Sequence, residues 1–310
     1  MQGTVAVTDE GWYSFLQGRP NLTEVNFWRP SAYRAFRAPE FSPFMFKLRS
    51  PHNAVCGFAY FARYSRLPVW LAWEVFEQGN GVESLAEMEA RLARIRKRFG
   101  HKKTKWAGYI GCTLLVQPTF FPREAWVRQP EDWSPRTQAD SKYDLAVGEG
   151  RRVWEECLAV ARELGAQDPT PLGAESPARY GEPVLVRPRL GQGSFRIAVT
   201  DAYGRACAAT GEHSLPVLDA AHIVPFQKGG SHEVRNGLLL RADLHRLFDK
   251  GYFTVTPDLR MKVSSRLKEE FHNGATYYPL DDGFIRLPQD LTAQPNPDFL
   301  AWHNQEVFAV

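Results

Sequence analysis

Cysteine is scarce in this chain and follows no metal-binding or disulfide pattern. The 310 residues include only Cys56, Cys112, Cys157 and Cys207, and no two of these form a CxxC pair. Single, scattered cysteines are typical of a reducing compartment and argue against a disulfide framework or a four-cysteine zinc site. We therefore expect a cytoplasmic protein without structural zinc.

Long apolar runs and a large net charge are also missing. The longest apolar stretches, 67–73 and 111–116, are far shorter than the roughly 20 residues of a membrane helix. Residues 1–15 show neither the basic start nor the apolar stretch of a secretion signal. The net charge is only +3, which permits a nucleic-acid partner without requiring one. We expect no association with a membrane.

The composition is that of a globular protein with two unlike halves. Hydrophobic residues make up 44% and charged residues 24%, which excludes a disordered, collagen-like or coiled-coil chain. Eight of the nine tryptophans lie at or before Trp154, and five of the eight histidines lie between His213 and His272. We therefore expect domains over 1–164 and 185–310, joined by a Pro-, Gly- and Ala-rich linker over 165–184.

The first half shows a mixture of helix and strand patterns. Its strands are expected over 44–49, 54–64 and 106–117, and its helices over 84–99 and 148–164. Ser84 and Glu87 have the spacing of a capping box at the start of the first helix. The fold class predicted from these patterns is α+β.

Two features of this half suggest contacts with nucleic acid. Eight Lys and Arg residues and no acid fall between 91 and 105, from which we take Arg96, Lys97 and Lys103 as phosphate contacts. Trp28, Trp70 and Trp73 are candidates for a pocket that stacks on a modified base. The alternatives are a solvated charged face and core packing of the tryptophans.

The second half contains a predicted hairpin followed by a short helix. Strands are expected over 217–223 and near 237–240, and a helix over 242–250. This arrangement places His222 on a strand in front of the helix that carries His245 and Asp249.

The residue types along this hairpin and helix suit phosphodiester hydrolysis. His245 and Asp249 are four residues apart on one helix, so they share a face and can hold one cation. An imidazole at His222 can take a proton from water, and a cation can stabilise a leaving oxygen. Asn236 carries both a donor and an acceptor and can hold a loop in register.

The sequence motifs around these residues resemble those of the HNH endonuclease family, which has the ββα-metal fold. The matching residues are His222 in AAHIVP, Asn236 in NGLLL and His245 in ADLHRLFD, and the resemblance extends over about 187–288. It implies that His222 is the general base, His245 a metal ligand and Asn236 the residue that fixes the hairpin loop. It also implies one divalent metal ion, Mg²⁺ or Mn²⁺, with Ni²⁺ or Zn²⁺ left open by the mixed nitrogen and oxygen ligands.

The chain departs from the family pattern at two positions. Many members carry a metal-ligating Asp or His directly before the general base, where this chain has Ala221. We expect Asp219, two residues earlier on the same strand face, to take that place. Only Cys207 remains of the zinc cysteines found in many members, and we expect it to be a buried apolar residue. His213 and His232 are expected to be loop histidines.

The first half resembles predicted bacterial restriction endonucleases that place a sensor domain before an HNH domain. The motifs that carry this resemblance are FWRPS, FKLRSP, LAWEVFEQGNGV and IGCTLL. That resemblance implies a PUA-like β-barrel with helices in the first domain, and modification-dependent (type IV-like) cleavage of foreign double-stranded DNA. A double-strand cut by single-site domains also suggests a homodimer. Two alternatives stay open: an HNH nuclease triggered by phosphorothioate or structured nucleic acid, and a catalytically decayed DNA-binding protein.

Overall fold

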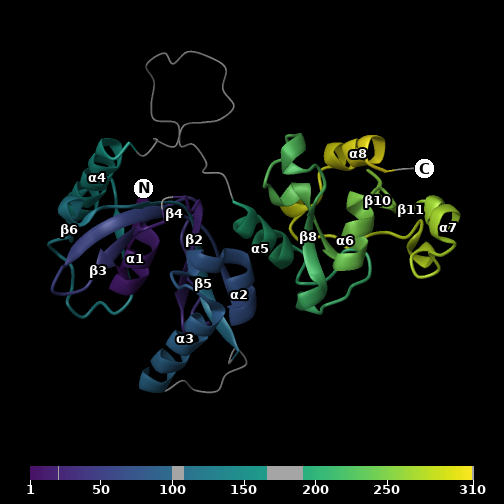
Figure 1. Cartoon of the computed structure of the whole chain (residues 1–310). Coiled ribbons are helices and arrows are strands. Elements are labelled where there is room, and N and C mark those ends of the chain that lie inside the picture. The colour runs from purple at the N-terminus through teal and green to yellow at the C-terminus, as the bar shows by residue number, and fades with distance from the viewer. Residues whose placement is uncertain (20, 100–107, 166–190, 309–310) are drawn as a thin grey trace, which may run out of the picture. The chain divides into compact units, whose positions relative to one another are not determined.

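The chain divides into two compact units in a computed structural model that describes residues 1–19, 21–99, 108–165 and 191–308 (Figure 1). The units are Met1–Gly191 and Gln192–Val310. The boundaries expected at 164 and 185 stay a prediction, because 166–190 lie outside the described residues. None of the helices in the described ranges is long and apolar enough to cross a membrane.

The first unit is a mixed α+β unit built on one sheet. In chain order its strands and α-helices are β1 (Gln2–Thr8), α1 (Glu10–Gln17), β2 (Glu24–Arg29), β3 (Pro43–Leu48), β4 (Ala54–Pro68), α2 (Val69–Phe76), α3 (Leu85–Phe99), β5 (Tyr109–Phe120), β6 (Val127–Arg128), β7 (Asp140–Asp144) and α4 (Gly148–Glu163). The sheet runs in the order β2-β5-β4-β3-β1-β7, with β6 paired to β4. Only the β1–β3 pair is parallel among the pairs described.

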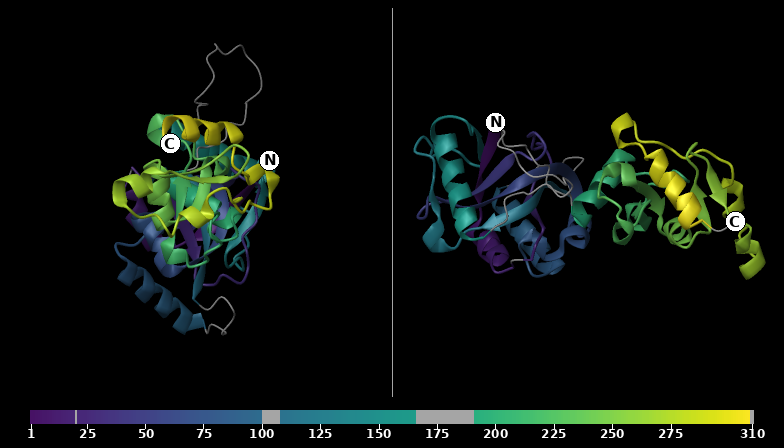
Figure 2. Two further views of the ribbon diagram at one scale, coloured as in Figure 1. Left: turned by 90° about the vertical axis from the view of Figure 1, so that its right-hand side faces the viewer. Right: turned by 90° about the horizontal axis from the view of Figure 1, so that it is seen from above.

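Both faces of this sheet are covered by helices (Figures 1 and 2). Trp12 and Leu16 of α1 pack with Phe44 on one face. On the other face, Trp154 of α4 packs with Met45. Because successive side chains of a strand point to opposite faces, β3 is buried at every position.

The sheet is curved but does not close through backbone hydrogen bonds. In the described part of the chain β2 and β7 are its two ends and are not paired. Arg29 of β2 and Asp140 of β7 nevertheless form a salt bridge of 2.6 Å, so side chains bring these two edges together. Register shifts along β4 add twist where the sheet bends. The expected barrel is therefore observed only as an α+β unit with an unclosed mixed sheet.

Most predicted elements of the first half are present, with shifted ends. Strands β3, β4 and β5 and helices α3 and α4 match the expected segments, although Trp106 lies outside the described residues. The Ser84 hydroxyl accepts the Glu87 backbone N–H at 3.2 Å. The Glu87 carboxylate accepts the backbone N–H of Glu83, one residue before the position of a regular capping box.

The second unit contains the predicted ββα arrangement. Its helices and strands are α5 (Gln192–Ala202), β8 (Leu218–His222), β9 (Gly237–Arg241), α6 (Ala242–Asp249), β10 (Phe253–Val255), β11 (Met261–Val263), α7 (Arg266–Phe271) and α8 (Pro297–Glu306). Strands β8 and β9 pair antiparallel, and α6 follows β9 directly. Cys207 is fully buried in the core of this unit, as expected.

His303 of α8 fastens the C-terminal helix to α6. Its ring is 2% exposed and stacks on Phe248, with ring centroids 3.6 Å apart. Nε2 donates to the Phe248 carbonyl at 3.1 Å, so the neutral ring leaves Nδ1 to accept from the Thr254 hydroxyl at 2.8 Å. Burial lowers the pKa of His303 to about 4, because the charged ring would have to be desolvated.

This buried histidine predicts a loss of stability in mild acid. The unfolded chain takes up a proton near pH 6.5, whereas folded His303 does so only near pH 4. Its contribution is therefore complete above about pH 6.5 and is lost as the pH falls toward 4. We expect the free energy of unfolding to fall by about 2 kcal/mol more between about pH 7.5 and 5 in the parent than in His303→Gln. Equal pH dependence in urea-unfolding curves of the two proteins would contradict this.

Candidate active site

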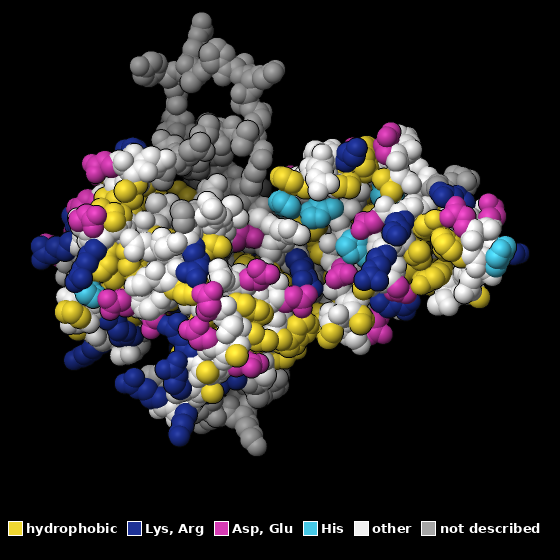
Figure 3. Space-filling view, in the orientation of Figure 1, with side chains coloured by type: hydrophobic (Ala, Val, Ile, Leu, Met, Phe, Trp, Pro, Cys, Tyr) yellow, Lys and Arg dark blue, Asp and Glu magenta, His cyan; other side chains and the backbone are white. Residues whose placement is uncertain are grey.

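One hollow of the second unit collects the residues singled out in the sequence. It has a volume of about 770 Å³, and His222, Asp219, His245 and Asp249 all line it. The lining comes from α5, β8, α6, α8 and the loop between the two hairpin strands. Figure 3 shows histidine side chains gathered at the surface of this unit.

His222 is the last residue of β8 and is held against α5. Its ring stacks on Phe195, with centroids 3.9 Å apart and planes 15° apart. Gly237 lies opposite His222 in the hairpin. A Cβ atom at Gly237 would lie 2.4 Å from Val199 and 3.0 Å from Phe195, so glycine is what lets α5 approach. Burial, reinforced by His232 and His245, lowers the pKa of His222 to about 4. His222 is therefore neutral at neutral pH and able to accept a proton.

Asn236 is fully buried and holds the hairpin loop. Its side-chain N–H groups donate to the carbonyls of Val224 (2.9 Å) and Ser231 (2.8 Å). Its side-chain oxygen accepts the Val224 backbone N–H at 2.9 Å. This amide therefore uses both its donor and acceptor groups on the loop that follows β8, and it positions that loop without facing the hollow.

Asp219, His245 and Asp249 form the acidic part of the site. The Asp219 carboxylate lies 3.5 Å from Nδ1 of His245, and the Asp249 carboxylate lies 3.4 Å from Nε2. Burial raises the pKa of Asp249, with nearby Asp219 adding to the rise and His245 opposing it. The strand position before His222 supplies no side-chain ligand, because the methyl group of Ala221 has no donor atom and is fully buried.

These donors suit a divalent cation, although they do not converge on one point. Among the described residues no three His, Cys, Asp or Glu side chains have the arrangement of a metal site. The two carboxylates contact opposite nitrogens of His245. A cation at either nitrogen would meet one carboxylate, while the other would orient the ring, as outer partners of metal-binding histidines do. Oxygen and imidazole donors of this kind fit the residues expected from the sequence.

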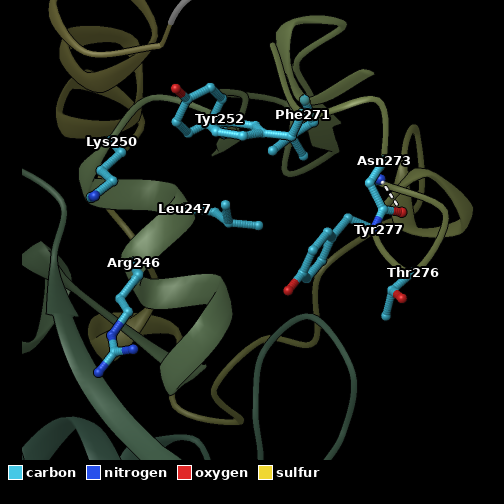
Figure 4. Close-up of a pocket in the computed structure, with 10 residues that line it drawn as sticks. Arg246, Leu247, Lys250, Tyr252, Phe271, Asn273, Thr276 and Tyr277 are labelled. Atoms are coloured by element: carbon cyan, nitrogen blue, oxygen red, sulfur yellow. Dashed lines mark hydrogen bonds between the residues drawn. The ribbon is translucent and has the colours of Figure 1, made fainter. Parts of the chain in front are cut away.

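A second pocket opens on the neighbouring face of α6. It has a volume of about 490 Å³ and is shown in Figure 4. Arg246 and Lys250, which directly follow His245 and Asp249, line it together with the aromatic ring of Tyr252. Positive side chains therefore lie on α6 beside the carboxylate-bearing face, where a phosphate backbone could be neutralised.

The structure places the candidate DNA contacts of the first unit in different roles. The Arg96 guanidinium donates to the carbonyls of Pro30 (3.0 Å) and Tyr109 (2.9 Å), and burial lowers its pKa. Arg96 thus fastens the end of α3 to the sheet. Lys97 is exposed, and Lys103 lies outside the described residues.

The three candidate tryptophans are neither fully buried nor exposed. Trp28 lies on β2, and its indole N–H donates to the Asn80 carbonyl at 2.9 Å. Trp70 and Trp73 lie on α2. Partial burial leaves each ring some surface for a ligand, so their part in a base pocket stays a prediction.

Residues 207–256 match the model of a family described as HNH endonuclease. The second unit carries an HNH endonuclease domain. The match includes His222, Asn236 and His245 and confirms the resemblance drawn from them. It supports a nuclease function with DNA as the substrate.

Several solved structures are similar to the chain at low scores. ASCH from Zymomonas mobilis has 13% identity, covers 51% of this chain and 94% of its own, and gives a TM-score of 0.31. The modification-dependent TagI restriction endonuclease has 12% identity, covers 98% of this chain and 81% of its own, and gives 0.30. At such scores these likenesses assign no residue or activity to the chain. No curated protein matches it.

Sequence reasoning missed two side chains of the site, one on α5 and one in the loop between β8 and β9. Phe195 supports the His222 ring, and His232 contacts His222 Nε2 at 3.1 Å through Nδ1. His232 does lie in a loop, as expected, but its ring contacts His222. His232 lies in the loop between β8 and β9, where neither the helix nor the strand period applies, so only the folded loop reveals the contact.

Arg96 and Lys97 provide a matched test of structure against binding. We expect Arg96→Met to lower the free energy of unfolding by about 1–3 kcal/mol, since the hydrogen bonds from the guanidinium to two carbonyls are lost. Lys97→Met on the same helix turn should change it by less than about 0.5 kcal/mol. Urea unfolding measures both. An equal effect of the two substitutions would show that Arg96 does not fasten α3.

Proposed function

We propose that this protein is a modification-dependent DNA endonuclease whose HNH domain hydrolyses phosphodiester bonds with one divalent metal ion. The observation that carries the proposal is the placement of a neutral His222 in the same hollow as Asp219, His245 and Asp249. A base and a carboxylate–imidazole ligand set beside each other are the parts that phosphodiester hydrolysis needs.

In the proposed reaction His222 takes the proton of a water molecule that attacks phosphorus. The new P–O bond forms as the bond to the leaving oxygen of the neighbouring nucleotide breaks, and that oxygen is then protonated from solvent. His245 would hold the divalent ion with Asp249 or Asp219, whichever carboxylate lies at the nitrogen used. The bound ion supplies neutralisation of charge on the phosphate and on the leaving oxygen. The ligand types favour Mg²⁺ or Mn²⁺ and leave Ni²⁺ and Zn²⁺ possible.

The first unit would act as the sensor, with a PUA-like organisation. Its half-buried Trp28, Trp70 and Trp73 offer aromatic surface for stacking on a modified base, and exposed Lys97 offers a phosphate contact. A homodimer acting in the cytoplasm on foreign double-stranded DNA completes the proposal.

Cleavage of matched plasmids tests this function. The panel carries unmodified, methylated, hydroxymethylated, glucosylated or phosphorothioate sites, with Mg²⁺ or Mn²⁺ present. We expect a base-modified plasmid to be cut and the unmodified one spared, and His222→Ala to slow cutting by about 10²–10⁴-fold, as loss of a general base does.

Other outcomes of this panel separate the alternatives. Cutting only of phosphorothioate DNA would replace the base sensor with a backbone trigger. No cutting of any DNA by the purified parent would favour the decayed DNA-binding protein, for which buried Ala221 is the supporting observation. Folded Trp28→Ala, Trp70→Ala and Trp73→Ala variants that all keep the preference would remove these rings from the sensor.

Manganese titration tests the ligand assignment. His245→Ala should weaken Mn²⁺ binding by about 10-fold or more, because the imidazole between the two carboxylates is removed. Asp249→Asn and Asp219→Asn show by calorimetry which carboxylate binds directly. An Asp219→Asn variant with parental affinity would show that this residue does not replace the ligand missing at Ala221.

A further inference from the structure

His232 is held in place by the same loop that Asn236 organises. The Asn236 side chain binds the carbonyl of Ser231, the residue directly before His232. The His232 ring stacks on Phe226, with centroids 4.8 Å apart and planes 6° apart. Its Nδ1 atom lies 3.1 Å from Nε2 of His222. A contact between two rings that are each fixed by stacking is a built feature of the site.

This contact restricts which tautomer of His222 can serve as a base. One of the two nitrogens must carry a proton for the hydrogen bond to form. If His232 Nδ1 were the donor, the proton of neutral His222 would lie on Nδ1, and neither of its nitrogens could accept from water. If His222 Nε2 is the donor, its Nδ1 keeps a lone pair. Only the second arrangement leaves a working base.

The surroundings of His222 Nδ1 agree with the second arrangement. Within the described part of the chain this atom has no hydrogen-bond partner. It is also not one of the fully buried polar atoms without a partner. It is therefore reached by solvent, as an atom that receives a proton from water must be.

We infer that His232 is a positioning residue for the general base: its Nδ1 accepts the Nε2–H of His222 and so keeps the His222 Nδ1 lone pair for the attacking water. This inference rests on the proposed function of the HNH domain. It adds a residue that lies outside the motifs by which the chain resembles the family, and it assigns the two nitrogens of His222 to different tasks.

Nitrogen NMR of the full chain tests the tautomer without any activity. With ¹⁵N-labelled histidine, the His222 signals are assigned by their loss in His222→Ala. We expect His222 to carry its proton on Nε2 in the parent and in His232→Asn, whose amide oxygen can accept in place of Nδ1. His232→Ala should give a mixture of tautomers. A parent with the proton on Nδ1, or an unchanged His222 in His232→Ala, would overturn the inference.

Rates on a plasmid that the parent cuts give the second readout. His232→Ala should lower kcat by about 10–100-fold with little change in KM, as loss of an orienting partner does. His232→Asn should recover most of that loss, and His213→Ala, at an exposed loop position, should lose nothing. Circular dichroism melts confirm that each variant is folded.

The same experiment distinguishes failure of this inference from failure of the proposed function. An inactive His222→Ala together with a fully active His232→Ala overturns only the role of His232. A fully active His222→Ala overturns the proposed use of His222 itself.

Discussion

The buried amide of Asn236 sets the geometry on which the HNH domain depends. Its bonds to Val224 and Ser231 tie both ends of the loop that leaves β8 to the residue before β9. The end of β8 therefore cannot shift relative to β9, and His222 stays opposite Gly237. A fully buried side chain that satisfies both its donors and its acceptor specifies one loop conformation strongly, because each lost bond would leave a polar group unpaired.

The site built on this loop combines a neutral base with a carboxylate-flanked imidazole. His222 packs on Phe195 and is partly buried, and this desolvation keeps the ring uncharged at neutral pH. His245 instead lies between Asp219 and Asp249, where negative charge surrounds it. Two histidines in one hollow thus receive opposite surroundings from β8 and α6. The apolar ring beside His222 suits a residue that takes a proton, and the carboxylates beside His245 suit a residue that holds a cation.

The hairpin and helix that carry the site could be predicted from the sequence, because they depend on the spacing of residues close together in the chain. The spacing of His245 and Asp249 on a helix and the hairpin around Asn236 predicted side chains that the structure does bring together or hold. Asp219 also lies at His245, as the strand alternation suggested. The contact between His222 and His232 depends on how a loop folds, and Arg96 became structural only because two carbonyls meet the end of α3. Tertiary contacts of this kind have no sequence period. In the first unit, the two edge strands of the sheet are joined by the Arg29–Asp140 salt bridge and not by backbone hydrogen bonds. Strand patterns in the sequence cannot distinguish such an open sheet from a closed barrel.

In the proposed hydrolytic centre, one metal ion at His245 works beside His222. Anomalous diffraction from crystals of the His222→Ala protein grown with Mn²⁺ and DNA locates that ion most directly. The account predicts one manganese peak bonded to a nitrogen of His245 and to the oxygen of Asp219 or Asp249, with a DNA phosphate bound to the same ion. A manganese ion held away from His245, or DNA bound with its phosphates outside this hollow, would contradict it.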